Sequence, residues 1–185
     1  MGYDKALEQA WEGAPREIKN NRFSIRLLSD TYDIDIDKKT IISRSCNAPA
    51  KEHISIIILH YLARKSKLKT LPDPSGEWID FKDLEGGEGY YPAFRKRTID
   101  RLVKKFGSSP ELLIKAVERI PHKKTGQGDA GIIVEALDDV GVFISVWGAD
   151  DEFGPSANIL FDRTISDIFC TEDIVVLTEI ITHSI

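Results

Sequence analysis

Three short segments near the start of the chain alternate apolar and polar residues: 23–27, 32–37 and 40–43. A period of two puts successive side chains on opposite faces of a strand, so each segment is expected to be a half-buried strand. Ser29-Asp30 and Asp37-Lys38-Lys39 are typical of the turns between such strands. The pattern predicts an antiparallel meander with one face toward solvent.

Apolar residues at helical spacing predict about five helices. They are expected at about 4–14, 51–66, 92–106, 110–120 and from 171 onward. The segment 51–66 is nearly all apolar along its middle, which predicts a helix that lies across the core. Pro92 and Gly107 bracket the third helix, because proline favours a helix start and glycine a helix end.

The second half of the chain also predicts strands, at 78–81, 131–137, 142–147 and 158–161. The turn Asp138-Asp139-Val140-Gly141 predicts that the middle two form a hairpin. Strands and helices do not alternate one for one, which favours the α+β class. We therefore expect one globular α+β domain over residues 1–185. Its mainly antiparallel sheet, the N-terminal meander plus the C-terminal hairpin, would pack with about five helices.

Composition narrows the class of protein. The net charge of −5 and a pI near 5.4 give no strong nucleic-acid signal, since nucleic-acid-binding domains are normally basic. Apolar runs fall short of the roughly 20 residues that a membrane span needs. Cys46 and Cys170 form no Cys-x-x-Cys pair, which favours a reducing cytoplasm. The composition predicts a cytoplasmic protein that does not bind membranes, with its cofactor and oligomeric state unknown.

The stretch Gly76–Arg97 concentrates aromatic residues around three glycines. Aromatic rings supply large burial energies, and glycines let a backbone approach a neighbouring chain or a ligand closely. The stretch is therefore either part of the core or the wall of a pocket. The pocket interpretation predicts a non-catalytic binding module for a small ligand or a protein partner. Its expected ligand-binding residues are Trp78, Asp80, Gly86, Gly87, Tyr90, Tyr91 and His60.

The tight reversal before Tyr90 has a consequence for the backbone. Such a reversal needs a residue at positive φ, which only glycine adopts without a Cβ penalty. We expect Gly86 or Gly87 to have positive φ, and an alanine substitution there to cost roughly 1 kcal/mol or more.

An acidic loop suggests an alternative, enzymatic function. Asp150 and Glu152 could bind a hard metal ion, or act with His60 or Asp80 in acid–base chemistry. This is the metal-assisted or acid–base enzyme hypothesis. A solvated loop explains the same residues without chemistry. The sequence holds no serine-hydrolase, P-loop or Ser-x-x-Lys motif, so we expect binding rather than catalysis.

A basic helix suggests a third function. The segment Arg95–Lys105 carries partner-binding candidates Arg95, Arg97 and Arg101, which could dock an acidic partner or phosphates. A solvated helix face that pairs with local acids is the alternative.

Three short motifs are better explained by structure than by chemistry. Gly126-x-Gly128-x-x-Gly131 lacks the preceding strand and following helix of a dinucleotide site, and predicts a loop that enters a hairpin. Asp33-x-Asp35-x-Asp37 lacks the glycine and glutamate of a calcium loop, and predicts the solvent face of a strand. His53 and His60 have no residues spaced to complete a zinc site.

Several runs together resemble an uncharacterised domain-of-unknown-function family of anaerobic archaea and bacteria. The runs are Gly2–Leu7, Ile58–Leu62, Gly76–Phe81, Gly86-Gly87, Tyr90–Phe94, Asp151–Phe153, Ile159–Asp162 and Thr171–Asp173. Some members are labelled iron–sulphur cluster proteins because of an appended cysteine-rich segment. Two cysteines are too few for a cluster that needs about four, so we do not expect the label to apply here. The resemblance implies a protein of anaerobes that serves metal-cofactor or one-carbon metabolism.

Overall fold

The computed structural model describes residues 3–16 and 21–185. The chain divides into two compact units, Met1–Pro72 and Asp73–Ile185. The prediction of one domain over the whole chain stays a prediction, and the two units are described separately below.

The first unit contains the predicted meander. Its elements are α1 (Asp4–Gly13), β1 (Arg22–Leu27), β2 (Asp30–Asp35), β3 (Thr40–Ser43) and α2 (Glu52–Leu68). The three strands pair antiparallel in chain order. The Asp33 carboxylate accepts two hydrogen bonds from the Arg44 guanidinium, at 2.7 and 2.9 Å, on the exposed face. Asp33 and Asp35 therefore belong to the strand as predicted, whereas β2 ends at Asp35 and Asp37 lies in the turn that follows it.

Helix α2 forms the centre of this unit. Ile57, Ile58, Leu59 and Tyr61 have no exposed surface, which confirms the core helix expected from its apolar middle. Helix α1 packs against it. His60 is half-buried on the same helix.

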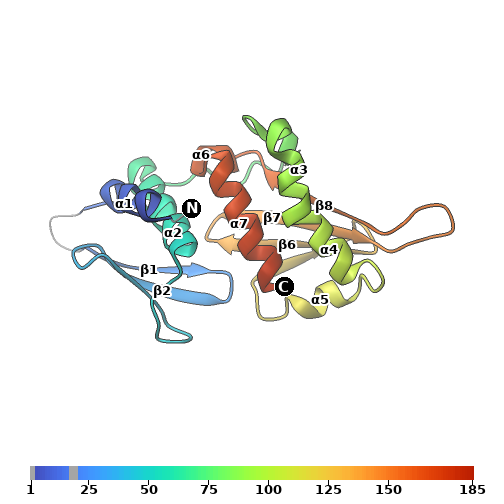
Figure 1. The fold of residues 1–185 in the computed structure, drawn as a ribbon, viewed down its shortest axis with the longest axis horizontal. Coiled ribbons are helices and arrows are strands. Elements are labelled where there is room, and N and C mark those ends of the chain that lie inside the picture. The colour runs from blue at the N-terminus through green and yellow to red at the C-terminus, as the bar shows by residue number, and fades with distance from the viewer. Residues whose placement is uncertain (1–2, 17–20) are drawn as a thin grey trace. The chain divides into compact units, whose positions relative to one another are not determined.

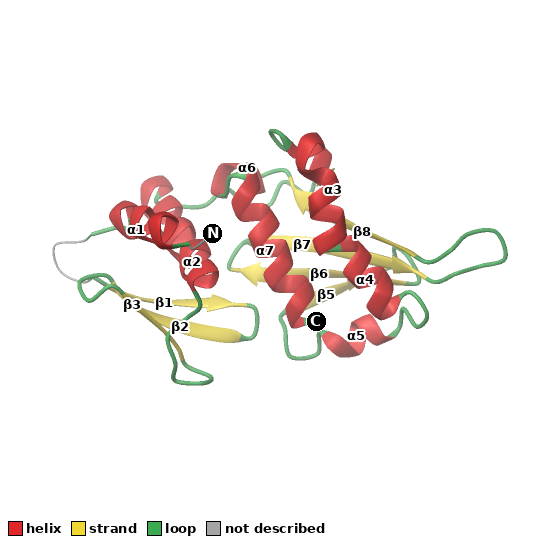
Figure 2. Ribbon diagram, viewed as in Figure 1, coloured by secondary structure: helices red, strands yellow, loops and turns green. Residues whose placement is uncertain are grey.

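The second unit is an antiparallel five-stranded sheet covered by helices (Figures 1 and 2). In sheet order the strands are β4 (Trp78–Asp80), β8 (Ser156–Asp162), β7 (Val140–Trp147), β6 (Ala130–Leu137) and β5 (His122–Thr125). The helices are η1 (Phe81–Asp83), α3 (Gly87–Arg97), α4 (Ile99–Phe106), α5 (Leu112–Ala116), α6 (Ile165–Ile168) and α7 (Thr171–Ser184). The α+β class with antiparallel strands is confirmed.

The two faces of this sheet differ. Helices α3, α4 and α7 lie over one face, with α3 and α4 following each other in nearly one line (Figure 1). Strand residues on that face, such as Ile144 and Phe161, are fully buried. The register places Phe143, Leu160 and Trp78 on the opposite face, where Leu160 and Trp78 stay half-exposed.

The predicted basic helix differs from the observed one at its start and in its middle. Helix α3 begins at Gly87, so Pro92 lies inside it rather than at its first turn. Proline removes only one intrahelical hydrogen bond here, and its position is exposed. The helix also ends at Thr98, whose hydroxyl donates to the Phe94 carbonyl oxygen at 2.7 Å, before α4 begins.

Two other predictions of local structure need correction. The helix expected over 110–120 is only Leu112–Ala116, followed by turns up to Ile120. Strand β5 covers His122–Thr125, where no strand was predicted, and it pairs with β6 through Thr125↔Gly131. The glycine motif therefore joins two strands, as expected for a hairpin loop.

Asp162 fixes the loop before β4 to the end of β8. Its side chain is buried and accepts hydrogen bonds from the backbone N–H groups of Ser75, Gly76 and Thr164. The hydroxyls of Ser75 and Thr164 also donate to it, at 2.9 and 2.7 Å. Burial alone raises the pKa of this carboxyl, but the five donors outweigh burial and lower the pKa to about 2.

We expect Asp162→Asn to lower the free energy of unfolding by about 2 kcal/mol near neutral pH, because one pKa unit corresponds to about 1.4 kcal/mol. A lowered pKa stabilises the fold above the unfolded-state value near 4. That contribution is lost as the pH falls toward 2. The difference between wild type and variant should therefore shrink across this window in urea titrations at a series of pH values. A difference that is the same at pH 3 and pH 7, or that also occurs for the exposed Asp151→Asn, would contradict this role.

Among the residues that the structure describes, no helix has the combined length and hydropathy needed to cross a bilayer.

Candidate functional site

The aromatic stretch divides into a core part and a surface part. Phe81 and Phe94 stack with ring centroids 4.0 Å apart and planes 4° apart, and both contact the ring of Phe161. All three rings are fully buried. These residues hold η1 and α3 against the helix-covered face of the sheet, so this part of the stretch is core.

The glycine turn has the backbone that the sequence predicted. Gly86 has a φ of +69°, and helix α3 starts directly after it. Gly87 is required for a different reason. A Cβ at that position would overlap the carbonyl oxygen of Phe81 and lie 3.1 Å from its carbonyl carbon. Gly86 thus provides the positive φ, and Gly87 allows the start of α3 to approach the backbone of Phe81 closely.

The structure separates the three rings that were predicted to line a pocket. Trp78 packs against Phe143 at 5.4 Å, on the sheet face away from the helices. Tyr91 lies on α3, where the Lys82 ammonium is 4.2 Å from its ring centroid. Tyr90 is 60% exposed. Tyr90 and Tyr91 thus share one helix, whereas Trp78 belongs to the opposite side of the sheet.

The other predicted ligand-binding residues have local structural contacts. The Asp80 carboxylate accepts from the Lys82 N–H at 2.9 Å, and that of Asp83 from the Asp80 N–H, which caps η1. His60 belongs to the first unit and Asp80 to the second. Ligand binding by this set stays a prediction.

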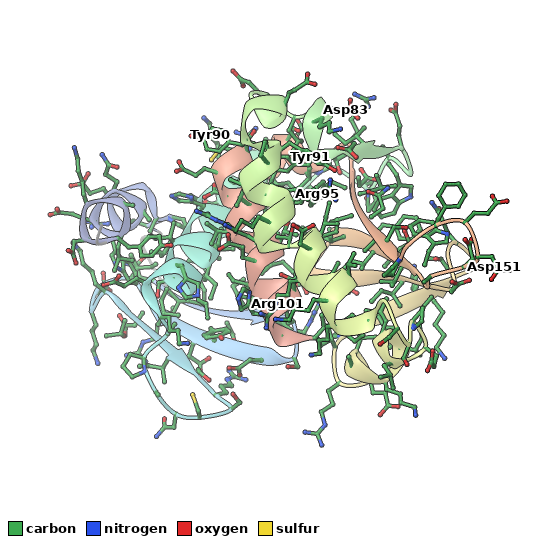
Figure 3. The ribbon with its side chains drawn as sticks, turned by 45° about the vertical axis from the view of Figure 1, so that its right-hand side comes forward. Asp83, Tyr90, Tyr91, Arg95, Arg101 and Asp151 are labelled. Carbon is green, nitrogen blue, oxygen red and sulfur yellow. The ribbon has the colours of Figure 1, made fainter. Side chains whose placement is uncertain are left out.

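In the acidic loop between β7 and β8, the Asp150 carboxylate accepts hydrogen bonds from the backbone of the loop itself. Asp150 accepts from the N–H groups of Glu152 and Phe153, at 2.8 and 2.6 Å, and these hydrogen bonds lower its pKa. Figure 3 shows Asp151 near the tip of this loop, away from α3 and α4. Over residues 3–16 and 21–185, the structure shows no group of three or more His, Cys, Asp or Glu that could hold a metal ion. The metal role of Asp150 and Glu152 stays a prediction.

The basic residues of α3 and α4 border an open hollow of about 360 Å³ against α7. Its lining residues are Lys96, Arg97, Arg101, Glu179 and His183. We call this site the basic hollow. Figure 3 shows Arg95 and Arg101 along the same line of α3 and α4 that carries Tyr90 and Tyr91.

Hydrogen bonds orient the side chains of the basic hollow. Arg97 donates to the Glu179 carboxylate at 3.2 Å, and Arg101 donates through Nε to the Thr182 carbonyl oxygen at 3.0 Å. The ring nitrogen Nδ1 of His183 is 2.7 Å from the Glu179 carbonyl oxygen, to which it donates. These contacts use one nitrogen of each side chain, so Arg97 and Arg101 keep further N–H donors at the hollow that they line. Lys96 forms no ion pair among the described residues.

The charge of the basic hollow contrasts with the rest of its unit. In residues 73–185, 21 Asp and Glu outnumber 12 Lys and Arg. Half of those Lys and Arg residues fall between Arg95 and Lys105. Such clustering concentrates a positive potential on one part of an otherwise acidic surface, which is what attracts a negatively charged partner.

The sequence singled out some of the residues that line this hollow and not others. Arg97 and Arg101 were partner-binding candidates, and the hollow brings them together with Lys96. Arg95 is outside the lining and pairs with Asp100 at 3.2 Å. Glu179 and His183 are about eighty residues further along the chain, and no motif in their segment signals a site. Their i, i+4 spacing on a helix is the one feature that could have marked them as neighbours.

The class of protein is therefore an α+β protein whose second unit carries a local basic hollow on an acidic background. The chain belongs to the family described as Domain of unknown function (DUF3786), whose model matches residues 6–184. Searches of curated proteins and of solved structures gave no match.

Proposed function

We propose that this protein is a non-catalytic binding module that docks a negatively charged partner in the basic hollow. The observation that carries the proposal is the convergence of Lys96, Arg97, Arg101 and His183 on one open depression. Guanidinium groups bind carboxylates and phosphates through paired N–H donors, so two adjacent arginines suit the recognition of anions.

The chemistry of the lining favours binding over catalysis. The guanidinium groups of Arg97 and Arg101 offer only hydrogen-bond donors and no acceptor, which suits the binding of an anion. The Glu179 carboxylate forms an ion pair with Arg97. His183 is held by the Glu179 backbone and not by its carboxylate. Within the described part of the chain, no Ser, Thr or Cys side chain lines the hollow to serve as a nucleophile.

The length of the basic surface supports a macromolecular partner. Arg95 to Lys105 covers eleven residues on two nearly collinear helices, which is about 16 Å at the helical rise. An acidic segment of another protein can contact cations over that distance, whereas one small anion cannot. An acidic protein partner therefore accounts for both the hollow and the cations that extend beyond it.

The setting of this binding is also part of the proposal. Cys46 and Cys170 are free and exposed, which supports a reducing cytoplasm. The family resemblance supports a partner from the metal-cofactor or one-carbon metabolism of anaerobes.

Poly-L-glutamate is a suitable probe of the proposed function. We expect fluorescence anisotropy to show binding that weakens steeply as salt rises, because most of the attraction is screened Coulomb energy. The triple variant Lys96→Gln, Arg97→Gln, Arg101→Gln should bind at least about tenfold more weakly, since each lost charge contact contributes about 0.5–1 kcal/mol.

A matched control removes three cations of the same unit outside the basic hollow: Arg119→Gln, Lys123→Gln and Lys124→Gln. Both triple variants change the net charge equally, so a general charge effect would weaken both. Equal weakening in the two variants, salt-independent binding, or no binding by the wild type would overturn the proposed function.

A further inference from the structure

Among the described residues that line the basic hollow, Glu179 is the single acidic one, and it is paired with Arg97. The pair links helices α7 and α3 across 82 positions of sequence. The Glu179 side chain is 28% exposed and the Arg97 side chain is 60% exposed. An anion that enters the hollow therefore meets an arginine already bound to a carboxylate.

The ion pair between Glu179 and Arg97 is weak enough for another carboxylate to replace Glu179. A single hydrogen bond, with an oxygen–nitrogen distance of 3.2 Å, joins the two side chains. Arg163, elsewhere in the unit, donates two hydrogen bonds to Glu77. Ion pairs at this exposure contribute little net stability because water and salt compete with them. An external carboxylate can therefore take the place of Glu179 without a large cost to the fold.

We propose that Glu179 is an internal competitor that occupies Arg97 until a carboxylate of the partner replaces it. This inference rests on the proposed function of the basic hollow. Glu179 sets the affinity of the site, and it selects for partners that present several carboxylates close together. A single carboxylate only exchanges the Glu179–Arg97 ion pair for an equivalent one. An acidic segment also contacts Lys96 and Arg101 and therefore gains additional binding energy.

The existing contact of Arg97 favours a carboxylate partner. The Glu179 carboxylate already lies 3.2 Å from the Arg97 guanidinium, so the hollow accommodates a group of this size and charge. The helix dipoles oppose each other here, because Lys96, Arg97, Glu179 and His183 lie near the C-terminal ends of α3 and α7, whereas Arg101 lies in the first turn of α4.

The test compares Glu179→Gln with the wild type in binding poly-L-glutamate by fluorescence anisotropy at fixed ionic strength. We expect the variant to bind about three- to tenfold more tightly, because its amide neither holds Arg97 as an ion pair nor repels the incoming anion. Glutamine keeps the size of the side chain, so thermal unfolding should be unchanged. Glu179→Ala, which also removes the hydrogen bond, should bind at least as tightly as Glu179→Gln.

Asp100→Asn is the matched control. It also removes one negative charge, but from α4, and it breaks the Arg95–Asp100 ion pair, which lies outside the lining of the hollow. We expect a change of less than about twofold, since an exposed pair contributes little.

The outcomes separate the inference from the proposed function. Binding by the wild type that is unchanged or weakened by Glu179→Gln overturns the competitor role and leaves the proposed function standing. Equal gains for Glu179→Gln and Asp100→Asn overturn it as well, since net charge then explains both. If Glu179→Gln strengthens the binding of inorganic polyphosphate but not that of poly-L-glutamate, the proposed preference for carboxylates is overturned. No binding by any of the proteins overturns the proposed function itself.

Discussion

Phe94→Ala is expected to lower the free energy of unfolding by about 3–5 kcal/mol, the usual cost of removing a buried aromatic ring. The Phe94 side chain is 1% exposed and stacks on Phe81 at 4.0 Å. It also contacts Phe161 on the sheet. Truncation therefore leaves a cavity where α3, η1 and β8 meet. Chemical denaturation of the two proteins under the same conditions measures the effect.

Tyr90→Ala is the control for this experiment. Tyr90 is an aromatic residue of the same helix, one turn earlier, and it is 60% exposed. We expect it to change the free energy of unfolding by less than about 0.5 kcal/mol, as surface substitutions usually do. Similar losses for Phe94→Ala and Tyr90→Ala would contradict the division of the aromatic stretch into core and surface.

Gly87→Ala is expected to cost about 2–3 kcal/mol, because the new methyl group overlaps the backbone of Phe81 and cannot be relieved by rotating a side chain. The N–H of Gly87 donates to the Leu84 carbonyl oxygen at 2.9 Å, so moving this backbone also strains the turn. Gly86→Ala should cost roughly 1 kcal/mol through its positive φ alone, since its Cβ would meet open space. Thermal and urea unfolding measure both losses.

Gly89→Ala provides the comparison within the same helix. Gly89 has an ordinary backbone, and a Cβ there has no neighbour within 4 Å. Alanine should therefore stabilise the protein by up to about 1 kcal/mol through its higher helix propensity. If Gly87→Ala were as harmless as Gly89→Ala, the close approach between α3 and η1 would not exist in solution.

Local sequence patterns predicted the strands and turns well where packing and turn chemistry agree. Thr40–Ser43 was expected with its observed bounds, because alternation and the preceding lysine turn both indicate a strand. The hairpin turn was expected as well, although the second strand begins at Val140 rather than Val142 and leaves only Asp138 and Asp139 between the strands. Asp139 takes a φ of +64°, a left-handed conformation that Asp adopts more readily than most residues.

Patterns failed where tertiary contacts override local preference. Strand β5 contains Lys123 and Lys124 and shows no apolar alternation, so only its pairing with β6 makes it a strand. Helix α3 begins among glycines, which are poor helix formers, because Phe94 anchors it on the core. Helix α7 begins at Thr171 as expected, but a long-range contact that the pattern does not show holds this residue, because its hydroxyl donates to the Glu85 carbonyl oxygen.

The candidate site could be predicted only in part for the same reason. The charge cluster from Arg95 to Lys105 is visible in the sequence because its members are neighbours. The hollow exists because α7 packs beside α3, which brings Glu179 within reach of Arg97. Contacts over eighty positions leave no local signal in one sequence. Conversely, Trp78 and Tyr91 are close in sequence, and the sheet separates them.

Backbone amide chemical shifts, recorded while poly-L-glutamate is added, test the central claim most directly because they locate the binding surface. We predict that the largest salt-sensitive changes occur at residues 96–101 and 179–183, which come from both sides of the basic hollow. Changes confined to Trp78 and Phe143 on the open sheet face, or to Asp150–Phe153 in the acidic loop, would contradict it.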